Sequence, residues 1–173
     1  MGQLMRLHAP KITQLSREIL DALISNRDIE TAAPEEVRRD IESVLNQYLT
    51  DEAQVTERAK EILAARGLPP NELGRIRRLV AEERKIQIGD ETIDYLLDQL
   101  AEILMHSTSV DEVWAEDFEL RRHMRDPLRK HATLDDQLQA EVRGKLKHVQ
   151  EGTALWEVEY RRMMEDMRRR KGL

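Results

Sequence analysis

The sequence contains no cysteine and only one phenylalanine, five prolines and seven glycines among its 173 residues. The absence of cysteine excludes disulfide bonds, thiol catalysis and zinc sites with cysteine ligands. So few glycines and prolines are not typical of a protein built from many strands and turns. The chain also lacks the run of about 18 apolar residues that a membrane-spanning helix needs. The sequence therefore indicates a soluble, helical protein without a membrane role.

Charged residues make up 36% of the chain, and the net charge is -6. The apolar residues recur at helical spacing, so the chain is expected to fold rather than to be disordered. An acidic chain is not typical of a nucleic-acid-binding protein. The N-terminal residues lack the apolar core of a signal peptide, and we therefore expect a cytoplasmic protein.

The apolar periodicity and the helix-boundary residues predict an all-α fold with long amphipathic helices. Pro34 is expected to begin a long helix that ends at Gly67, since proline suits a first turn and glycine a C-terminal cap. Pro127 is expected to interrupt a later helix. A last helix is expected over residues 134–170.

One apolar pattern occurs twice in the sequence, because IQIGDETIDYL (86–96) repeats the apolar spacing of MRLHAPKITQL (5–15). An offset of 81 residues also aligns the apolar positions of the helices expected after these two segments. An offset of 105 aligns residues 36–68 with residues 141–173. We interpret this as an internal duplication. The first copy is 1–68, a helical linker is 69–85, and the second copy is 86–173 with an inserted helical segment at about 115–139. Helix periodicity alone guarantees some apolar matches, so chance similarity is the alternative.

The two copies also predict a minimal β-ribbon. Each begins with alternating apolar residues, around Met5 and around Ile86, and these two segments are expected to pair.

A heptad pattern runs from Val142 to Met167, with apolar residues at alternating spacings of four and three. This seam can pack within the monomer, which is the interpretation we favour, or form a homo-oligomer.

No catalytic motif is present, neither a nucleophile elbow nor a glycine-rich phosphate loop. Pairs such as Glu102 and His106 could place two metal ligands on one helix face, but 34 acidic residues make such pairs common by chance. The sequence predicts no catalytic site, no metal and no cofactor.

The segments GDETIDYLLDQL, EDFELRRHMRDPL and EVRGKLKHVQEGTALWEVEY resemble a bacterial family known as domain of unknown function family 507. The resemblance extends over the whole chain. It implies a bacterial, cytoplasmic protein, and it implies no activity, cofactor or partner.

The function that the sequence favours is a non-enzymatic protein–protein interaction, in an adaptor or regulatory protein. Aromatic residues and arginine are common at interface hot spots, and the proposed insertion holds such a set. Its members are Trp114, Phe118, Arg121, Arg122 and His123. Trp114 and Phe118 could also belong to the core, and we expect at least one of them to be buried.

The alternative is a nucleic-acid-binding regulator, because each copy begins in a way that resembles a ribbon-helix-helix protein. In that family a β-ribbon enters the major groove. The side chains between the apolar strand residues would face the bases, namely Arg6, Lys85 and Gln87.

Overall fold

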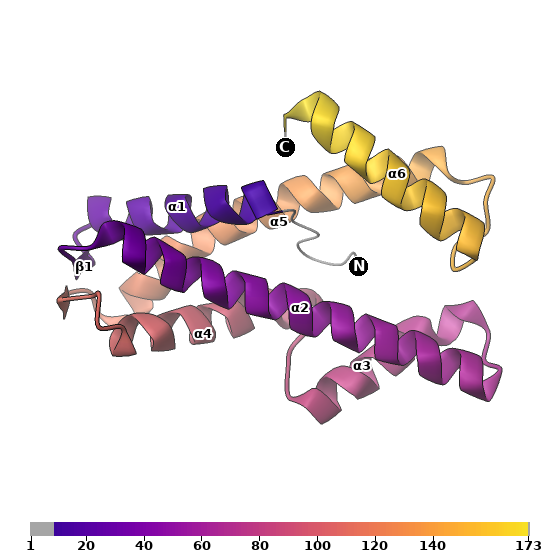
Figure 1. The fold of residues 1–173 in the computed structure, drawn as a ribbon, viewed down its shortest axis with the longest axis horizontal. Coiled ribbons are helices and arrows are strands. Elements are labelled where there is room, and N and C mark those ends of the chain that lie inside the picture. Colours follow the sequence, from indigo (N-terminus) through magenta and orange to yellow (C-terminus); the bar gives the residue numbers. More distant parts are fainter. Residues whose placement is uncertain (1–8, 173) are drawn as a thin grey trace.

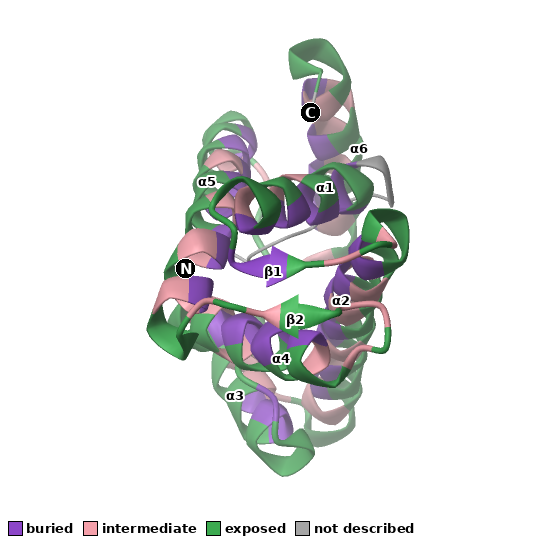
Figure 2. Cartoon of the chain, turned by 90° about the vertical axis from the view of Figure 1, so that its left-hand side faces the viewer, coloured by how far each residue is buried: buried purple, intermediate pink, exposed green. Residues whose placement is uncertain are grey.

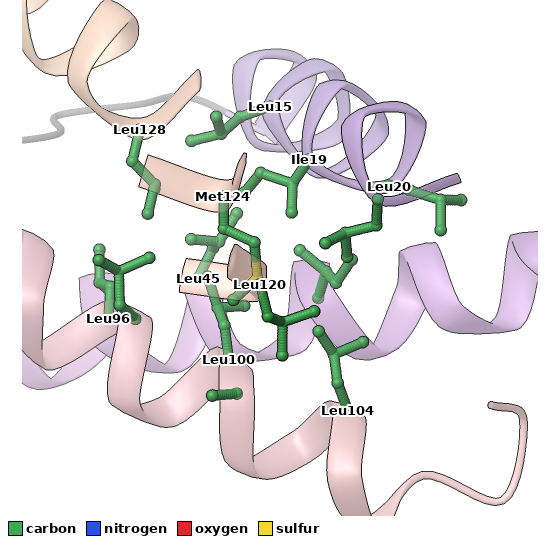
Figure 3. Packing of buried hydrophobic residues seen from close by; sticks show 14 of the residues in the cluster. Leu15, Ile19, Leu20, Leu45, Leu96, Leu100, Leu104, Leu120, Met124 and Leu128 are labelled. Carbon is green, nitrogen blue, oxygen red and sulfur yellow. The ribbon is translucent and has the colours of Figure 1, made fainter. Parts of the chain in front are cut away.

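The computed structural model describes residues 9–172, and its centre is an arrangement of four helices (Figure 1). These are α1 (Ala9–Ser25), α2 (Pro34–Arg66), α4 (Thr92–His106) and α5 (Asp117–Lys145). Each helix contributes one apolar stripe to a shared core, because residues three and four apart lie on the same face. Leu15, Leu45, Leu96 and Met124 come from the four helices in turn and are all buried there (Figure 3). The all-α fold is therefore confirmed.

Two helical hairpins extend from this core, and we call them the arms. In the first arm, α3 (Leu73–Arg84) packs against α2, and in the second, α6 (Ala154–Lys171) packs against α5 (Figure 1). Short 3-10 turns, η1 (Pro70–Glu72) and η2 (Gly89–Glu91), precede α3 and α4. Each arm has its own hydrophobic cluster, separate from that of the four-helix core.

A minimal antiparallel ribbon lies at one end of the core. Its strands are β1 (Ile29–Glu30) and β2 (Glu112–Val113), in the register Ile29↔Val113 and Glu30↔Glu112. A two-stranded ribbon was predicted, but its position was predicted wrongly. Met5 lies outside the described residues, and Ile86 is a buried residue in the connection between α3 and α4, not in a strand. Strands of two residues are too short to show an alternating pattern, so the sequence could not locate them.

Helix α2 has the boundaries that its sequence predicts. Pro34 is its first residue, where the missing N–H has no partner to lose. Gly67 follows its last residue in the left-handed conformation, with φ 61°, and donates its N–H to the carbonyls of Ala64 and Leu63. Pro69 and Pro70 then prevent the helix from continuing.

Helix α5 differs most from expectation. It continues through Pro127 to Lys145, and α6 begins only at Ala154, so the predicted single helix over 134–170 is wrong. Proline removes one helical hydrogen bond, but Met124 and Leu128 on either side are fully buried in the core. Their packing outweighs the local preference. The range 115–139 forms most of this helix, and the structure does not set it apart as an inserted element.

The order helix, strand, long helix and arm helix occurs twice along the described chain. The two strands begin 83 residues apart, and so do α2 and α5. At this offset DIETAAPEEVRRDI (28–41) aligns with DEVWAEDFELRRHM (111–124), with five identical residues. The strand register is symmetric under the same offset, since Ile29 pairs with the counterpart of Glu30. The internal duplication stays a prediction.

The heptad seam between Val142 and Met167 is folded back on itself. Its residues lie at the end of α5, in a turn where Gly152 has φ 90°, and on α6. Trp156 and Tyr160 stack with ring centroids 4.6 Å apart, inside the cluster of the second arm. The buried seam residues thus pack together within one chain, as in the interpretation we favoured. Homo-oligomer formation stays a prediction.

Each arm also contains a buried acid–base pair. In the second arm, Arg168 Nη2 lies 2.9 Å from Asp135 Oδ1, and Gln139 donates to the same carboxylate at 2.7 Å. In the first arm, Arg77 Nη2 lies 3.7 Å from Glu52 Oε1. Glu52 and Asp135 are counterparts at the offset of 83, but their arginine partners are not, since Tyr160 corresponds to Arg77.

Candidate functional site

The β-ribbon lies at one end of the molecule (Figure 2). Backbone hydrogen bonds hold the residues around β2 in place there. The backbone N–H groups of Trp114 and Ala115 both donate to the carbonyl of Asp28, at 2.8 and 3.1 Å. Asp111 donates its N–H to the carbonyl of Glu30 at 2.8 Å. The backbone on both sides of β2 is therefore held, and the side chain of Trp114 projects from a fixed position.

Trp114 and Phe118 are the exposed aromatic residues of this end, with 65% and 60% of their surface accessible. We expected at least one to be buried, and that expectation is wrong. Leu120 and Met124 are the first α5 residues to enter the core. Phe118 stands two positions before Leu120, which turns its side chain to the opposite side of the helix.

The first half carries polar residues at the positions equivalent to these aromatics. Thr31 corresponds to Trp114 and Glu35 to Phe118 at the offset of 83. Thr31 donates its hydroxyl to the carbonyl of Ser109, and Glu35 pairs with Arg17 at 3.0 Å. Thr31 and Glu35 thus make contacts within the chain, whereas Trp114 and Phe118 have most of their surface exposed to solvent.

The three other predicted interface residues have different surroundings. Arg121 pairs with Asp98 of α4 and, at 2.7 Å, with Asp117. His123 Nδ1 lies 2.6 Å from the buried carboxylate of Asp28. These two residues hold α5 against its neighbours. Arg122 is exposed and makes no side-chain hydrogen bond or ion pair within residues 9–172, and it lies one helical turn after Phe118.

The same end of the molecule is rich in carboxylates. The segment DEVWAEDFE (111–119) has five acidic residues and no basic one. In the ribbon, Glu30 and Glu112 are directly opposite each other, and both are exposed. Trp114 therefore lies among carboxylates, whereas Phe118 has both these carboxylates and the exposed Arg122 nearby along the chain.

Two of the residues predicted to contact nucleic acid, Lys85 and Gln87, are not in the ribbon. Lys85 is the exposed C-cap of α3, and Gln87 is exposed in the connection before α4. The ribbon follows the other end of α4, and a helix of 15 residues is about 22 Å long. Arg6 lies outside the described residues. The ribbon that does form presents glutamates, which phosphate groups repel.

The part of the chain that the structure describes has no group of three or more His, Asp or Glu residues placed to hold a metal ion. Within the same range, no helix combines the length and apolarity needed to cross a bilayer.

A cavity of about 520 Å³ lies between α2, α3 and the start of α4, and Tyr48, Glu52 and Arg77 line it. Glu52 and Arg77 pair with each other, and the Tyr48 hydroxyl donates to the carbonyl of Gln87 at 3.0 Å. These contacts hold α3 and the connection that follows it against α2.

We expect the Tyr48 hydroxyl to make folding stability depend on alkaline pH. It lies 2.9 Å from the hydroxyl of the buried Thr92, and burial raises the pKa of Tyr48 above its ordinary value of 10.0. Tyr48 therefore loses its proton at a lower pH in the unfolded chain than in the folded chain. As a result, the free energy of unfolding falls as pH rises above about 10. Tyr48→Phe should lower stability by about 1 kcal/mol at neutral pH and make the alkaline decline shallower. Urea titrations across pH test this, and an unchanged decline would contradict it.

Comparison with known proteins gives a family but no activity. A family model with the description "Protein of unknown function (DUF507)" matches residues 5–173. A search of the curated proteins found no match.

Proposed function

Because the chain belongs to the DUF507 family, whose description assigns no activity, we propose a function from the surface of the molecule itself. We propose that it is a non-enzymatic adaptor or regulatory protein of the bacterial cytoplasm. It binds another protein through Trp114 and Phe118. The observation that carries this proposal is the exposure of both side chains at 65% and 60%.

The exposure is selective, because the chain uses its other aromatic residues internally. It has two tryptophans, three tyrosines and one phenylalanine. Tyr48, Trp156 and Tyr160 are buried, and Tyr95 is partly buried. Large aromatic side chains at interfaces supply much of the binding energy, and single truncations there cost about 2 kcal/mol or more. Two neighbouring exposed aromatics at a fixed place therefore favour partner binding.

The nucleic-acid alternative has less support. Its ribbon presents Glu30 and Glu112 instead of basic or amide side chains, and the proposed base contacts Lys85 and Gln87 lie elsewhere.

Site-specific photo-cross-linking in the source cells tests the proposal. A photoreactive phenylalanine analogue at position 118 should give a specific cross-linked product with another protein. The same analogue at Glu35, its counterpart in the first half, is the matched control. Trp114→Ala in the position-118 variant should reduce the yield about tenfold or more. If position 118 gives no product, or only those of position 35, the proposed function is wrong.

A further inference from the structure

Only some of the carboxylates around Trp114 make hydrogen bonds or ion pairs with the described residues. Asp111 accepts the backbone N–H of Ala32 at 2.9 Å, and Asp117 pairs with Arg121 at 2.7 Å. Glu112 and Glu116, each two positions from Trp114, are exposed and make no side-chain hydrogen bond or ion pair among residues 9–172. Two carboxylates beside the aromatic surface are therefore available to a partner.

Stabilisation of α5 accounts for only part of this charge, because Glu116 is the N-cap residue at the positive end of the helix dipole, whereas Glu112 lies outside the helix. Acidic side chains in a first helical turn interact favourably with the positive end of the helix dipole, which explains Asp117 and Glu119. Glu112 is in β2, directly opposite Glu30. Like charges in directly opposite strand positions are destabilising. A bound positive charge would relieve this repulsion, whereas nothing within the described chain does.

The combination of an exposed indole and free carboxylates fits one class of ligand. The face of a tryptophan ring attracts ammonium and guanidinium groups. The aliphatic parts of lysine and arginine can pack on apolar surface while their charged ends reach a carboxylate. Nucleic acid and anionic membranes would instead be repelled. Phe118 adds a place for an apolar side chain of the same ligand.

We propose that the surface formed by Trp114, Phe118, Glu112 and Glu116 binds a basic amphipathic segment of a partner protein. The segment places apolar side chains on Phe118 and on the edge of Trp114, and lysine or arginine side chains beside Glu112 and Glu116. This inference rests on the proposed function and adds the chemical nature of the partner.

Fluorescence anisotropy with the full chain and a labelled helical peptide of leucine and lysine tests this inference. The matched probe is the same peptide with glutamate in place of every lysine. We expect the lysine peptide to bind, with affinity that falls as salt rises. The glutamate peptide should bind at least about tenfold more weakly, because opposite charges attract and like charges repel across an interface.

Variants assign the binding to this surface. Glu112→Gln with Glu116→Gln should weaken binding on the order of fivefold, and Trp114→Ala about tenfold. Glu83→Gln with Glu165→Gln removes two exposed charges elsewhere and should leave the affinity unchanged. The inference is overturned if both peptides bind alike, if the control pair weakens binding as much as the Glu112 and Glu116 pair, or if Trp114→Ala has no effect.

The two proposals can fail separately. If position 118 cross-links a partner but the lysine peptide shows no preference, the partner is not basic and only the inference fails. A product that is a second copy of this chain would also overturn the inference. If position 118 cross-links nothing, the proposed function itself fails.

Discussion

Leu45→Ala and Leu128→Ala are each expected to lower the free energy of unfolding by about 3 kcal/mol. Both side chains are fully buried in the four-helix core, Leu45 on α2 and Leu128 on α5. Truncation removes apolar contacts and leaves a cavity that close-packed neighbours can fill only in part. Urea denaturation followed by circular dichroism measures the change.

The matched control for these variants is Leu155→Ala, which truncates a leucine that is 61% exposed on α6. It should change stability by less than about 0.5 kcal/mol. Because Leu45 and Leu128 are counterparts at the offset of 83, their losses should also be similar. A loss at either core position no larger than that of Leu155→Ala would contradict the four-helix core.

The second large effect is expected for Asp135→Ala, which should destabilise the second arm by about 3 kcal/mol. The Asp135 side chain is 4% exposed and lies 2.9 Å from Arg168, whose own side chain is 15% exposed. Without Asp135, a largely buried guanidinium loses its counter-charge and Gln139 loses an acceptor. Hydrogen exchange should show faster exchange of the α6 amides, with less change in the four-helix core.

Two further variants separate a buried ion pair from an exposed one. Asp135→Leu with Arg168→Met replaces both partners by apolar groups and should recover much of the loss. Glu141→Gln removes one partner of the exposed pair with Lys171, where the side chains are 43% and 48% exposed. That change should cost less than about 1 kcal/mol. Equal losses for Asp135→Ala and Glu141→Gln would show that burial of the pair has no energetic consequence.

Features of this fold that depend on neighbours in sequence could be predicted. Helix α2 begins at Pro34 and ends before Gly67 because both signals act locally, through a missing N–H and a left-handed cap. The spacing of Leu96, Leu100 and Leu104 by four residues likewise places them on one face of a helix, and this is the face of α4 that is buried. These parts needed no knowledge of distant contacts.

Features that depend on tertiary contacts were missed. Pro127 is tolerated within α5 only because Met124 and Leu128 pack into the core, and no local signal reports that packing. The pairing of Ile29 with Val113 joins distant parts of the chain through very short strands. At the candidate site, residue type alone selected Trp114 and Phe118. The exposure of Phe118 follows from which side of α5 faces the core, with Leu120 as its first core residue, and Trp114 is held before that helix by its backbone bond to Asp28. Neither contact could be read from the sequence.

The placement of the ribbon has a consequence for the order of folding. Each arm joins helices that are adjacent in sequence, whereas the pairing of Ile29 with Val113 joins residues that α2, α3 and α4 separate along the chain. Closing a longer loop costs more conformational entropy, and contacts between distant residues slow folding. The arms can therefore form as local hairpins first, and strand pairing completes the molecule. The surface around Trp114, whose backbone is held by Asp28, is then among the last parts to take shape, so the partner binding that we propose there would require a fully folded chain.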